Sequence, residues 1–228
     1  MRILALDTAT QICSTALLSV DAAITRERLS EQRGHAAHIL KMIDAVLGEA
    51  GIVLADVRAL AFGRGPGAFT GVRLAASITQ GLAFAAHLPV VPVSDLRAVA
   101  QRAFDEEREL AHVLVCQDAR MQELYWAGFD RGADGLAVAV GDEHVSTAAS
   151  VTLPPHWHSA IGAAGEGFRI HPELARRWPF ARVLDELLPR AIEIARLAWP
   201  TVASGATVCA QEALPVYVRD EVARPSRN

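Results

Sequence analysis

The stretch GRGPGAFTG, residues 63–71, decides the fold, because it joins an apolar run at residues 57–62 to a long apolar segment at residues 72–86. A short apolar run is typical of a buried strand, and a long segment that is apolar on most faces is typical of a buried helix. Glycine permits close backbone approach, and a helix N-terminus attracts anions. The loop has neither the Gly-Lys-Ser/Thr ending of a P-loop nor the spacing of a dinucleotide-binding fingerprint. It predicts a tight strand-to-helix turn and leaves the ligand of that turn open.

The segments before this loop predict strands followed by a helix. Residues 2–7, 13–20 and 22–29 are strand-like runs joined by short turns, which predicts a three-stranded meander. Residues 35–50 repeat apolar side chains at intervals of three and four, which is the pattern of an amphipathic helix.

The segments after the loop continue the alternation. Pro89 and Pro92 bracket a short strand, and Ser94 or Asp95 is expected to cap a helix that runs through Ala103. Further elements follow the charged run at residues 105–109: strands at 111–117, 123–129 and 136–140, a strand leading into a loop at 159–167, a helix at 189–199 that Pro200 ends, and an extended edge segment at 214–219. This order predicts an α/β chain with a first lobe at residues 1–104 and a second at residues 105–228, whose C-terminal segment returns to the first lobe.

The composition excludes several classes of protein. Apolar residues make up 51% of the 228 positions, which excludes a wholly disordered chain. The 22 Lys and Arg against 26 Asp and Glu give a formal charge of −4, and such a chain is a poor autonomous binder of nucleic acid. The most apolar stretch, residues 81–93, is interrupted by a histidine and two prolines, and the three cysteines are widely spread. The sequence therefore predicts a soluble, cytoplasmic protein without a transmembrane segment, a disulfide framework or a zinc cluster.

The turn after the first strand, Asp7-Thr8-Ala9-Thr10, has two interpretations. An acidic residue beside hydroxyls and backbone N–H groups is the kind of turn that holds a phosphate with its metal ion. Alternatively, Asp7 caps the turn and the threonines bond to the local backbone, which such residues commonly do. The local pattern favours the second interpretation, and Ala9 stands where close phosphate approach prefers glycine.

Three other groups of polar residues leave alternatives open. Arg73 is expected in the first helical turn, where its charge is unfavourable to the helix dipole; it needs a carboxylate, a phosphate or another chain as a partner, or else bonds to nearby carbonyls. His35 and His38 lie one turn apart without a third ligand at a definite spacing, which favours a structural or surface role over a metal site. Asp118 and Arg120, at a strand end, are consistent with a structural ion pair.

Five segments resemble the motifs of the TsaB (YeaZ) family. They are RILALDTAT at residues 2–10 with Cys13 and Ser14 after it, GRGPGAFTGVR at 63–73, QGLA at 80–83, DAR at 118–120 with ELYW at 123–126, and PVYVR at 215–219. The resemblance covers nearly the whole chain and is weakest between residues 132 and 200. It implies the actin-like ATPase (ASKHA) fold, an α/β architecture of two RNase H-like lobes in which the second lobe is reduced.

The same resemblance implies a function in tRNA modification. Members of the family work with the catalytic paralogue TsaD and the ATPase TsaE to place threonylcarbamoyl on N6 of adenosine 37 in tRNAs that read ANN codons. The complex uses ATP, Mg²⁺ and threonylcarbamoyl-adenylate, and no cofactor is expected on this chain alone. The tRNA is expected to be held indirectly, through the complex, which agrees with the net charge of −4. A homodimer is expected when the partner is absent, and no contact with a membrane is expected.

The resemblance further implies that this chain is a catalytically silent, activating subunit. Aligned on the glycine loop, the paralogue carries Asn-His-Leu-Glu-Gly-His where this sequence has Ser94-Asp95-Leu96-Arg97-Ala98-Val99. Asp95 and Val99 therefore stand where the metal-binding histidines would be. Valine cannot ligate a metal, and one carboxylate alone does not make a site. We expect no catalytic residue and no metal ligand.

Three sets of residues are expected to carry what function remains. The partner interface is formed by the helices at residues 35–50 and 72–86 and by the rim of the glycine loop, through His35, Ile39, Ile43, Arg64, Gly65, Pro66, Phe69, Thr70, Gly71, Arg73, Leu74, Ile78 and Leu82. A degenerate nucleotide site comprises Asp7, Thr10 and Ser14, and the C-terminal motif comprises Pro215, Tyr217 and Arg219. The alternative function is an independent ASKHA-type ATPase or small-molecule kinase that holds a magnesium–nucleotide complex at that nucleotide site.

Overall fold

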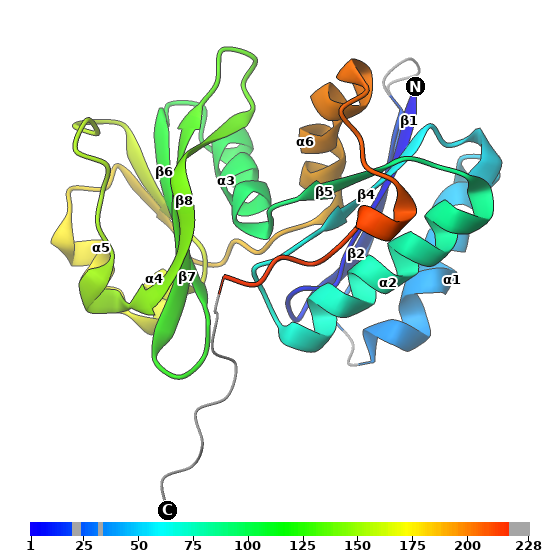
Figure 1. The fold of residues 1–228 in the computed structure, drawn as a ribbon. Coiled ribbons are helices and arrows are strands. Elements are labelled where there is room, and N and C mark those ends of the chain that lie inside the picture. The colour runs from blue at the N-terminus through cyan, green and yellow to red at the C-terminus, as the bar shows by residue number, and fades with distance from the viewer. Residues whose placement is uncertain (20–23, 32–33, 219–228) are drawn as a thin grey trace, which may run out of the picture.

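The computed structural model describes residues 1–19, 24–31 and 34–218, which form two five-stranded sheets (Figure 1). The first sheet comprises β1 (Arg2–Asp7), β2 (Cys13–Ser19), β3 (Ile24–Ser30), β4 (Ala59–Gly63) and β5 (Val90–Val93). The second sheet comprises β6 (His112–Asp118), β7 (Glu123–Arg131), β8 (Ala137–Thr147), β9 (Ile161–Ala164) and β10 (Arg182–Leu184). The α-helices are α1 (His35–Glu49), α2 (Phe69–Ala86), α3 (Asp95–Glu106), α4 (Gly167–Ile170), α5 (Pro172–Arg177) and α6 (Ala191–Ser204). Short 3₁₀ helices lie at η1 (Leu54–Asp56), η2 (Ala148–Ser150) and η3 (Ala210–Glu212).

The two sheets have the same strand order. In the first, β3-β2-β1-β4-β5, the strands β1 to β3 form an antiparallel meander and β4 and β5 run parallel to β1. In the second, β8-β7-β6-β9-β10, the strands β6 to β8 form the meander and β9 and β10 run parallel to β6. Each sheet thus has RNase H-like topology, and the predicted α/β fold of two such lobes is confirmed.

The helices form layers on both sides of the first sheet. Helices α1 and α2 pack against one face of it, and α6 packs against β1, β2, β4 and β5 (Figure 1). Helix α3 packs against β6, β7 and β8, and also against α6. Each lobe is therefore covered on its inner side by a helix from the other half of the chain. The division between residues 104 and 105 stays a prediction, and it falls within the last turn of α3.

The apolar core continues from one lobe to the other. One cluster of fully buried side chains includes Ile3 of β1, Phe104 of α3, Val113 of β6 and Ile194 of α6. A second cluster lies between the first sheet and the helices α1 and α2, and a third lies between the second sheet and the helices α4 and α5. The shared first cluster fixes the two sheets relative to one another.

Pro200 does not end the last helix, so that part of the prediction is wrong. Helix α6 continues to Ser204, and Pro200 lies exposed within it. The helix ends instead at Gly205, whose φ of 75° lets its N–H return to the carbonyls of Thr201 and Val202. Proline removes one helical N–H, but a left-handed glycine is the stronger stop signal here.

The other predicted elements are present with shifted ends. Helix α2 begins at Phe69, so the last residues of the glycine-rich stretch are helical, and β8 extends to Thr147. The part of the predicted meander at residues 20, 22 and 23 lies outside the described residues. In the part of the chain that the structure describes, no helix has the length and apolar character needed to cross a membrane.

Candidate functional site

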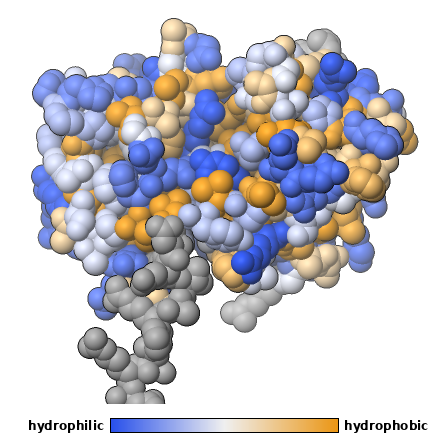
Figure 2. Space-filling model, in the orientation of Figure 1, coloured by the Kyte–Doolittle hydropathy of each residue, from blue (hydrophilic) through white to orange (hydrophobic). Residues whose placement is uncertain are grey.

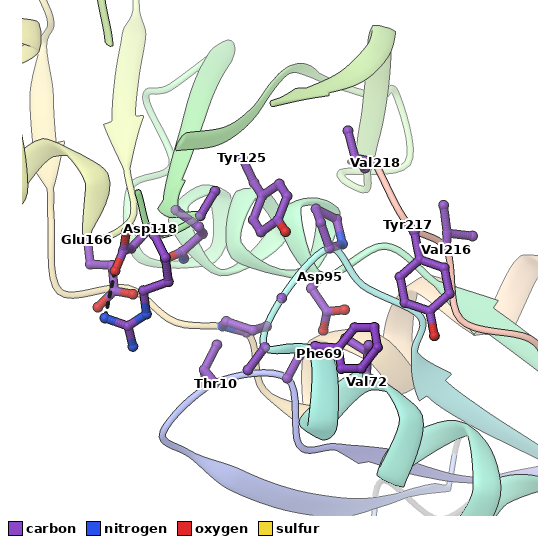
Figure 3. A pocket seen from close by; sticks show the side chains of 18 of the residues that line it. Thr10, Phe69, Val72, Asp95, Asp118, Tyr125, Glu166, Val216, Tyr217 and Val218 are labelled. Atoms are coloured by element: carbon purple, nitrogen blue, oxygen red, sulfur yellow. Dashed lines mark hydrogen bonds and ion pairs between the residues drawn. The ribbon is translucent and has the colours of Figure 1, made fainter. Parts of the chain in front are cut away.

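A cavity of about 430 Å³ lies between the two lobes (Figure 3). Its lining comes from the turn after β1, the glycine loop, the starts of α2 and α3, the end of β6 and the C-terminal segment. Asp118 and Glu166 lie at one end of the cavity, and Phe69 and Tyr217 lie at the other (Figure 3). Hydrophilic residues also gather in the middle of the face drawn in Figure 2, where the two halves of the molecule meet. This cavity is the candidate functional site.

The glycine loop, residues 63–71, is held by segments that are far apart in the sequence. The Arg64 N–H donates to the Val93 carbonyl at 2.8 Å, and the Arg64 carbonyl accepts from the Val216 N–H at 2.8 Å. The Ala68 N–H donates to the Ala9 carbonyl, also at 2.8 Å. The loop therefore ties the turn after β1 and the C-terminal segment to β5.

Glycine is required in this loop because other backbone lies against it. Gly65 has a φ of 103°, and a Cβ there would lie 2.9 Å from the Val216 carbonyl oxygen. A Cβ at Gly67 would lie 2.7 Å from the Cβ of Ala9, and a Cβ at Gly71 would collide with the Thr8 carbonyl. The glycines thus let the loop pack on neighbouring segments, and the turn after β1 is closed by the loop rather than open to a phosphate.

The three predicted nucleotide-binding residues do not meet at the cavity. Thr10 lines it, and its Oγ1 accepts from the Ile12 N–H at 3.2 Å. Asp7 is fully buried and accepts from the Ala9 N–H at 2.9 Å. Ser14 is also buried, and its Oγ accepts from the N–H of Ala191 at the start of α6. These contacts match the local hydrogen-bonding interpretation of the turn, and Ser14 serves as a cap for α6.

Asp7 and Asp95 form a buried carboxyl pair at the wall of the cavity, which Asp95 lines. The N–H of Gly65 donates to Asp95 Oδ2, while Asp7 Oδ2 and Asp95 Oδ1 receive no hydrogen bond from another described residue. Burial raises the pKa of Asp7 to about 6, and burial together with the charge of Asp7 raises the pKa of Asp95 well above its usual range. Two like charges so close cannot both ionise in a dry site, so the pair holds a proton. Ser94 Oγ caps α3 by accepting from the Arg97 N–H, which leaves Asp95 for this pair.

Arg64 spans the two lobes. Its guanidinium forms a bidentate ion pair with Glu143 of β8, with N–O distances of 3.1 and 3.2 Å. Only 24% of the Arg64 side chain and 15% of the Glu143 side chain are exposed. Arg64 was expected at the rim of a partner interface; the structure places it in this contact between the lobes, and its role toward a partner stays a prediction.

Phe69, Arg73 and Tyr217 form a cluster at the mouth of the cavity. The guanidinium of Arg73 lies 3.5 Å from the centre of the Phe69 ring, and Arg73 Nε donates to the Tyr217 hydroxyl at 2.7 Å. Arg73 is the fifth residue of α2, beyond the first turn in which the helix dipole acts. The expected unfavourable interaction between the Arg73 charge and the helix dipole is therefore absent. The guanidinium of Arg73 instead contacts the side chains of Phe69 and Tyr217 in its own chain. Pro215 belongs to the same C-terminal segment, and Arg219 lies outside the described residues.

The predicted interface residues fall into two groups. Four of them are buried: Ile39 and Ile43 in the core, and Gly65 and Pro66 in the glycine loop, where Pro66 lines the cavity. The apolar stripe of α1 faces the sheet, so Ile39 and Ile43 are covered in this conformation, and the interface role of all four residues stays a prediction. The others are at least partly exposed: His35, Arg64, Phe69, Thr70, Gly71, Arg73, Leu74, Ile78 and Leu82. Leu40 and Phe84, which were not assigned to the interface, are 48% and 69% exposed on the same two helices.

The hairpin between β6 and β7 adds residues that the sequence analysis did not assign to the cavity. Arg120 pairs with Asp118 at 2.9 Å, as expected, and both line the cavity together with Glu166. Arg120, Met121 and Gln122 all have positive φ, between 55° and 62°. Hairpin turns of this kind are normally recognised by Asn-Gly or Asp-Gly, so the sequence carried no signal for this one.

Two RNase H-like lobes with a cavity between them define a protein of the actin-like class. The sequence model of the family TsaD, tRNA N6-adenosine threonylcarbamoyltransferase, matches residues 27–211.

Full-length relatives narrow this class to one family. The chain is 38% identical to the tRNA threonylcarbamoyladenosine biosynthesis protein TsaB of Escherichia coli K12, over 98% of this chain and 96% of that protein. It is also 38% identical to TsaB of Haemophilus influenzae, over 97% of this chain and 95% of that protein. The solved structure of YeaZ from Pseudomonas aeruginosa is 40% identical and superimposes with a TM-score of 0.87 over 95% of this chain and 99% of that one. The chain belongs to the TsaB (YeaZ) family.

Proposed function

We propose that this chain takes part in the biosynthesis of threonylcarbamoyladenosine in tRNA, as a non-catalytic subunit that binds and activates a TsaD-type threonylcarbamoyltransferase. The observation that carries the proposal is the near-complete match to relatives named for that biosynthesis. The match of the TsaD family to residues 27–211 supports a paralogous relation between the two subunits.

The proposed partner surface is the outer side of α1 and α2, which lie on the same face of the first sheet (Figure 1). Phe84 and Leu40 expose large apolar side chains there, at 69% and 48%. Exposed Ser77 and Gly81 lie on the same helix as Phe84 and leave room for the close approach of another helix. Exposed apolar groups of this size on neighbouring helices favour burial by another chain. In the absence of the partner, the same surface would form a homodimer.

The residues that replace the paralogue's histidines support a non-catalytic role. Val99 of α3 is fully buried among the apolar side chains of the cluster that the two lobes share. Asp95 is engaged by the Gly65 N–H and by Asp7. Neither residue presents a metal ligand to the cavity in the manner of a histidine pair.

The remaining parts of the proposal concern the complex. It acts on N6 of adenosine 37 in ANN-decoding tRNAs in the cytoplasm, together with a TsaE-type ATPase. ATP, Mg²⁺ and threonylcarbamoyl-adenylate are used by the complex, and the tRNA is held mainly by the partner subunits. The acidic net charge of this chain supports that division of labour.

Reconstitution tests the proposal. The purified chain alone should transfer no threonylcarbamoyl, and its addition to TsaD-type and TsaE-type subunits should restore modification of tRNA. Phe84→Asp and Leu40→Asp should weaken binding to the TsaD-type subunit at least tenfold, because each places a charge in an apolar contact. Val183→Asp, at an exposed apolar position on β10 of the other lobe, is the matched control and should bind normally. Transfer of threonylcarbamoyl by the chain alone would contradict the non-catalytic role. Normal binding of the TsaD-type subunit by both Leu40→Asp and Phe84→Asp would contradict the proposed partner surface.

A further inference from the structure

We propose that Arg73 receives a carboxylate group of the TsaD-type subunit, and that the C-terminal segment at residues 213–218 forms part of the partner surface. The inference rests on the proposed function and names the chemistry at one end of that surface. Arg73, Ser77 and Phe84 are exposed, and their spacings along the chain place them on one side of α2. The charge of Arg73 therefore lies on the same side of the helix as the apolar side chain of Phe84.

Two aromatic side chains hold the guanidinium of Arg73 in place. Its Cζ lies 3.5 Å from the centre of the Phe69 ring and 5.4 Å from the centre of the Tyr217 ring. Its Nε donates to the Tyr217 hydroxyl at 2.7 Å. Figure 3 shows the two rings side by side, one at the start of α2 and one in the C-terminal segment. An arginine that is already fixed by cation–π contacts and a hydrogen bond loses little further conformational entropy when it binds a partner.

The outer part of this guanidinium is available for binding. Among the residues that the structure describes, no carboxylate lies within ion-pair distance of Arg73, and its Nη1 and Nη2 have no hydrogen-bond partner. Arg73 is the only charged residue of α2, so no neighbour on the helix neutralises it. The terminal N–H groups of a guanidinium match the two oxygens of a carboxylate. An acidic group from another molecule would complete these contacts.

The surroundings of Arg73 favour a carboxylate on a protein over a phosphate. Phe69, Leu214 and Tyr217 are 44%, 59% and 42% exposed. Aromatic and apolar side chains around an arginine are typical of the energetic centre of a protein–protein interface. Sites for nucleic acid instead combine several cations along one face, and this chain has a net charge of −4. A protein partner therefore fits this end of α2 better than RNA does.

The C-terminal segment runs along α2 and places Tyr217 beside Arg73. The Ala213 carbonyl accepts from Gln80 Nε2 at 3.1 Å, two helical turns from Arg73. The Val216 N–H donates to a carbonyl of the glycine loop at 2.8 Å. Figure 1 shows the segment, in red, running from α2 toward the second lobe. Tyr217 is thus a positioning residue for Arg73, and a partner that covers this end of α2 would also contact the segment.

Binding of the full-length chain to the purified TsaD-type subunit, measured by calorimetry at several salt concentrations, tests the proposal. Arg73→Gln should weaken binding about tenfold or more, because it removes the charge from the contact. It should also reduce the loss of affinity with added salt, which Arg73→Lys should retain. Tyr217→Phe keeps the ring, removes the hydroxyl acceptor and should weaken binding severalfold.

The matched control is Arg176→Gln, at an exposed position on α5 of the second lobe. This variant should bind the TsaD-type subunit like the unaltered chain, with the same dependence on salt. Circular dichroism verifies that each variant is folded. Equal weakening by Arg73→Gln and Arg176→Gln would mean that only the net charge matters, and would overturn the proposal.

The other outcomes separate this proposal from the proposed function. If Arg73→Gln and the unaltered chain bind the TsaD-type subunit with equal affinity and equal salt dependence, the carboxylate contact is overturned and the proposed function stands. If the unaltered chain does not bind the subunit, the proposed function fails and this proposal fails with it. If Arg73→Gln binds the subunit normally but the assembled complex retains tRNA less tightly, the group that Arg73 contacts is a phosphate, which also overturns the proposal.

Discussion

Asp7 and Asp95 face one another at the Cα of Gly63, where a Cβ would collide with a carboxyl oxygen of each. The pair joins the end of β1 to the start of α3, and the Gly65 N–H joins it to the glycine loop. A protonated carboxyl group donates a hydrogen bond that an ionised one cannot, so the proton is part of the packing at this point. The protonation state of the pair therefore affects the stability of the whole loop.

The pair predicts a dependence of stability on pH. The folded pKa of Asp7, about 6, exceeds the ordinary value of 3.8, and that of Asp95 is raised further, so the folded chain binds more protons than the unfolded chain. Their contribution to the free energy of unfolding is full below pH 3.8 and is lost as pH rises through 6 and above. In Asp7→Asn, the amide donates in place of the shared proton, so this variant should be more stable at pH 8 by about 1–3 kcal/mol.

Urea unfolding between pH 4.5 and 8 measures this effect. The difference in free energy between Asp7→Asn and the unaltered chain should grow with pH. Asp142→Asn, at an exposed position, should differ by less than about 0.5 kcal/mol throughout. A difference for Asp7→Asn that does not change with pH would show that no shared proton is present.

The ion pair between Arg64 and Glu143 predicts a coupling between the lobes. Because the pair is bidentate and mostly buried, a double-mutant cycle of Arg64→Gln and Glu143→Gln should give a coupling energy of about 1–3 kcal/mol. The exposed pair Arg28–Glu49 is the matched control and should give about 0.5 kcal/mol or less. Equal coupling in the two cycles would mean that the contact between the lobes contributes no more than a surface pair.

The close approach at Gly71 predicts opposite effects of alanine at two positions of α2. Gly71→Ala places a methyl group on the Thr8 carbonyl and should lower the free energy of unfolding by about 1–3 kcal/mol or more. Gly81→Ala meets no atom within 4 Å and should raise it by about 0.5–1 kcal/mol, since alanine favours a helix over glycine. Thermal and urea unfolding of both variants measure this; a stabilised Gly71→Ala would mean that the loop does not pack on the turn as described.

The closed turn after β1 predicts that the isolated chain does not bind Mg-ATP. The Thr8 hydroxyl donates to the Gly71 carbonyl at 2.7 Å, and Ala9 packs on Gly67, so the turn has no room for a phosphate. Calorimetric titration with Mg-ATP should give no saturable heat at micromolar concentrations. Clear micromolar binding would favour the alternative of an independent ATPase or kinase of this fold.

The sequence predicted most elements because their patterns are local. The strand at residues 2–7 and the helix at residues 35–50 match β1 and α1 to within one residue. The hairpin turn at Met121 and Gln122 has no typical turn residues, so no local pattern predicts it. The predicted helix end at Pro200 was wrong because α6, packed on the first sheet, continues to the stop at Gly205.

The candidate site was predicted only in part, because its contacts are long-range. The glycine loop was recognised from the sequence, whereas Asp118 was interpreted there only as one partner of a structural ion pair. Arg64 of this loop contacts Glu143 and Val216, which lie about 80 and 150 positions further along the chain. No local sequence pattern joins these two residues to the loop. Asp95 was recognised as a candidate helix cap, but its burial opposite Asp7 depends on the pairing of β4 with β1 and β5.

Helix α3 belongs to the first half of the chain but packs on the second sheet, and α6 belongs to the second half but packs on the first sheet. This crossed packing limits which parts of the fold can be lost during evolution. A cut between the halves would strip α6 from β1 and β2, and would expose the buried side chains of Ile3 and Ala5. Neither lobe can therefore be lost, replaced or borrowed as a separate module without loss of the other. Any shortening of the second lobe must begin at its outer elements, α4, α5 and β10, since the inner ones serve both halves. A subunit of this fold that lost its catalytic residues would still keep both sheets, because each sheet is covered by a helix from the other half of the chain. The cavity between the sheets would then remain available for a different ligand.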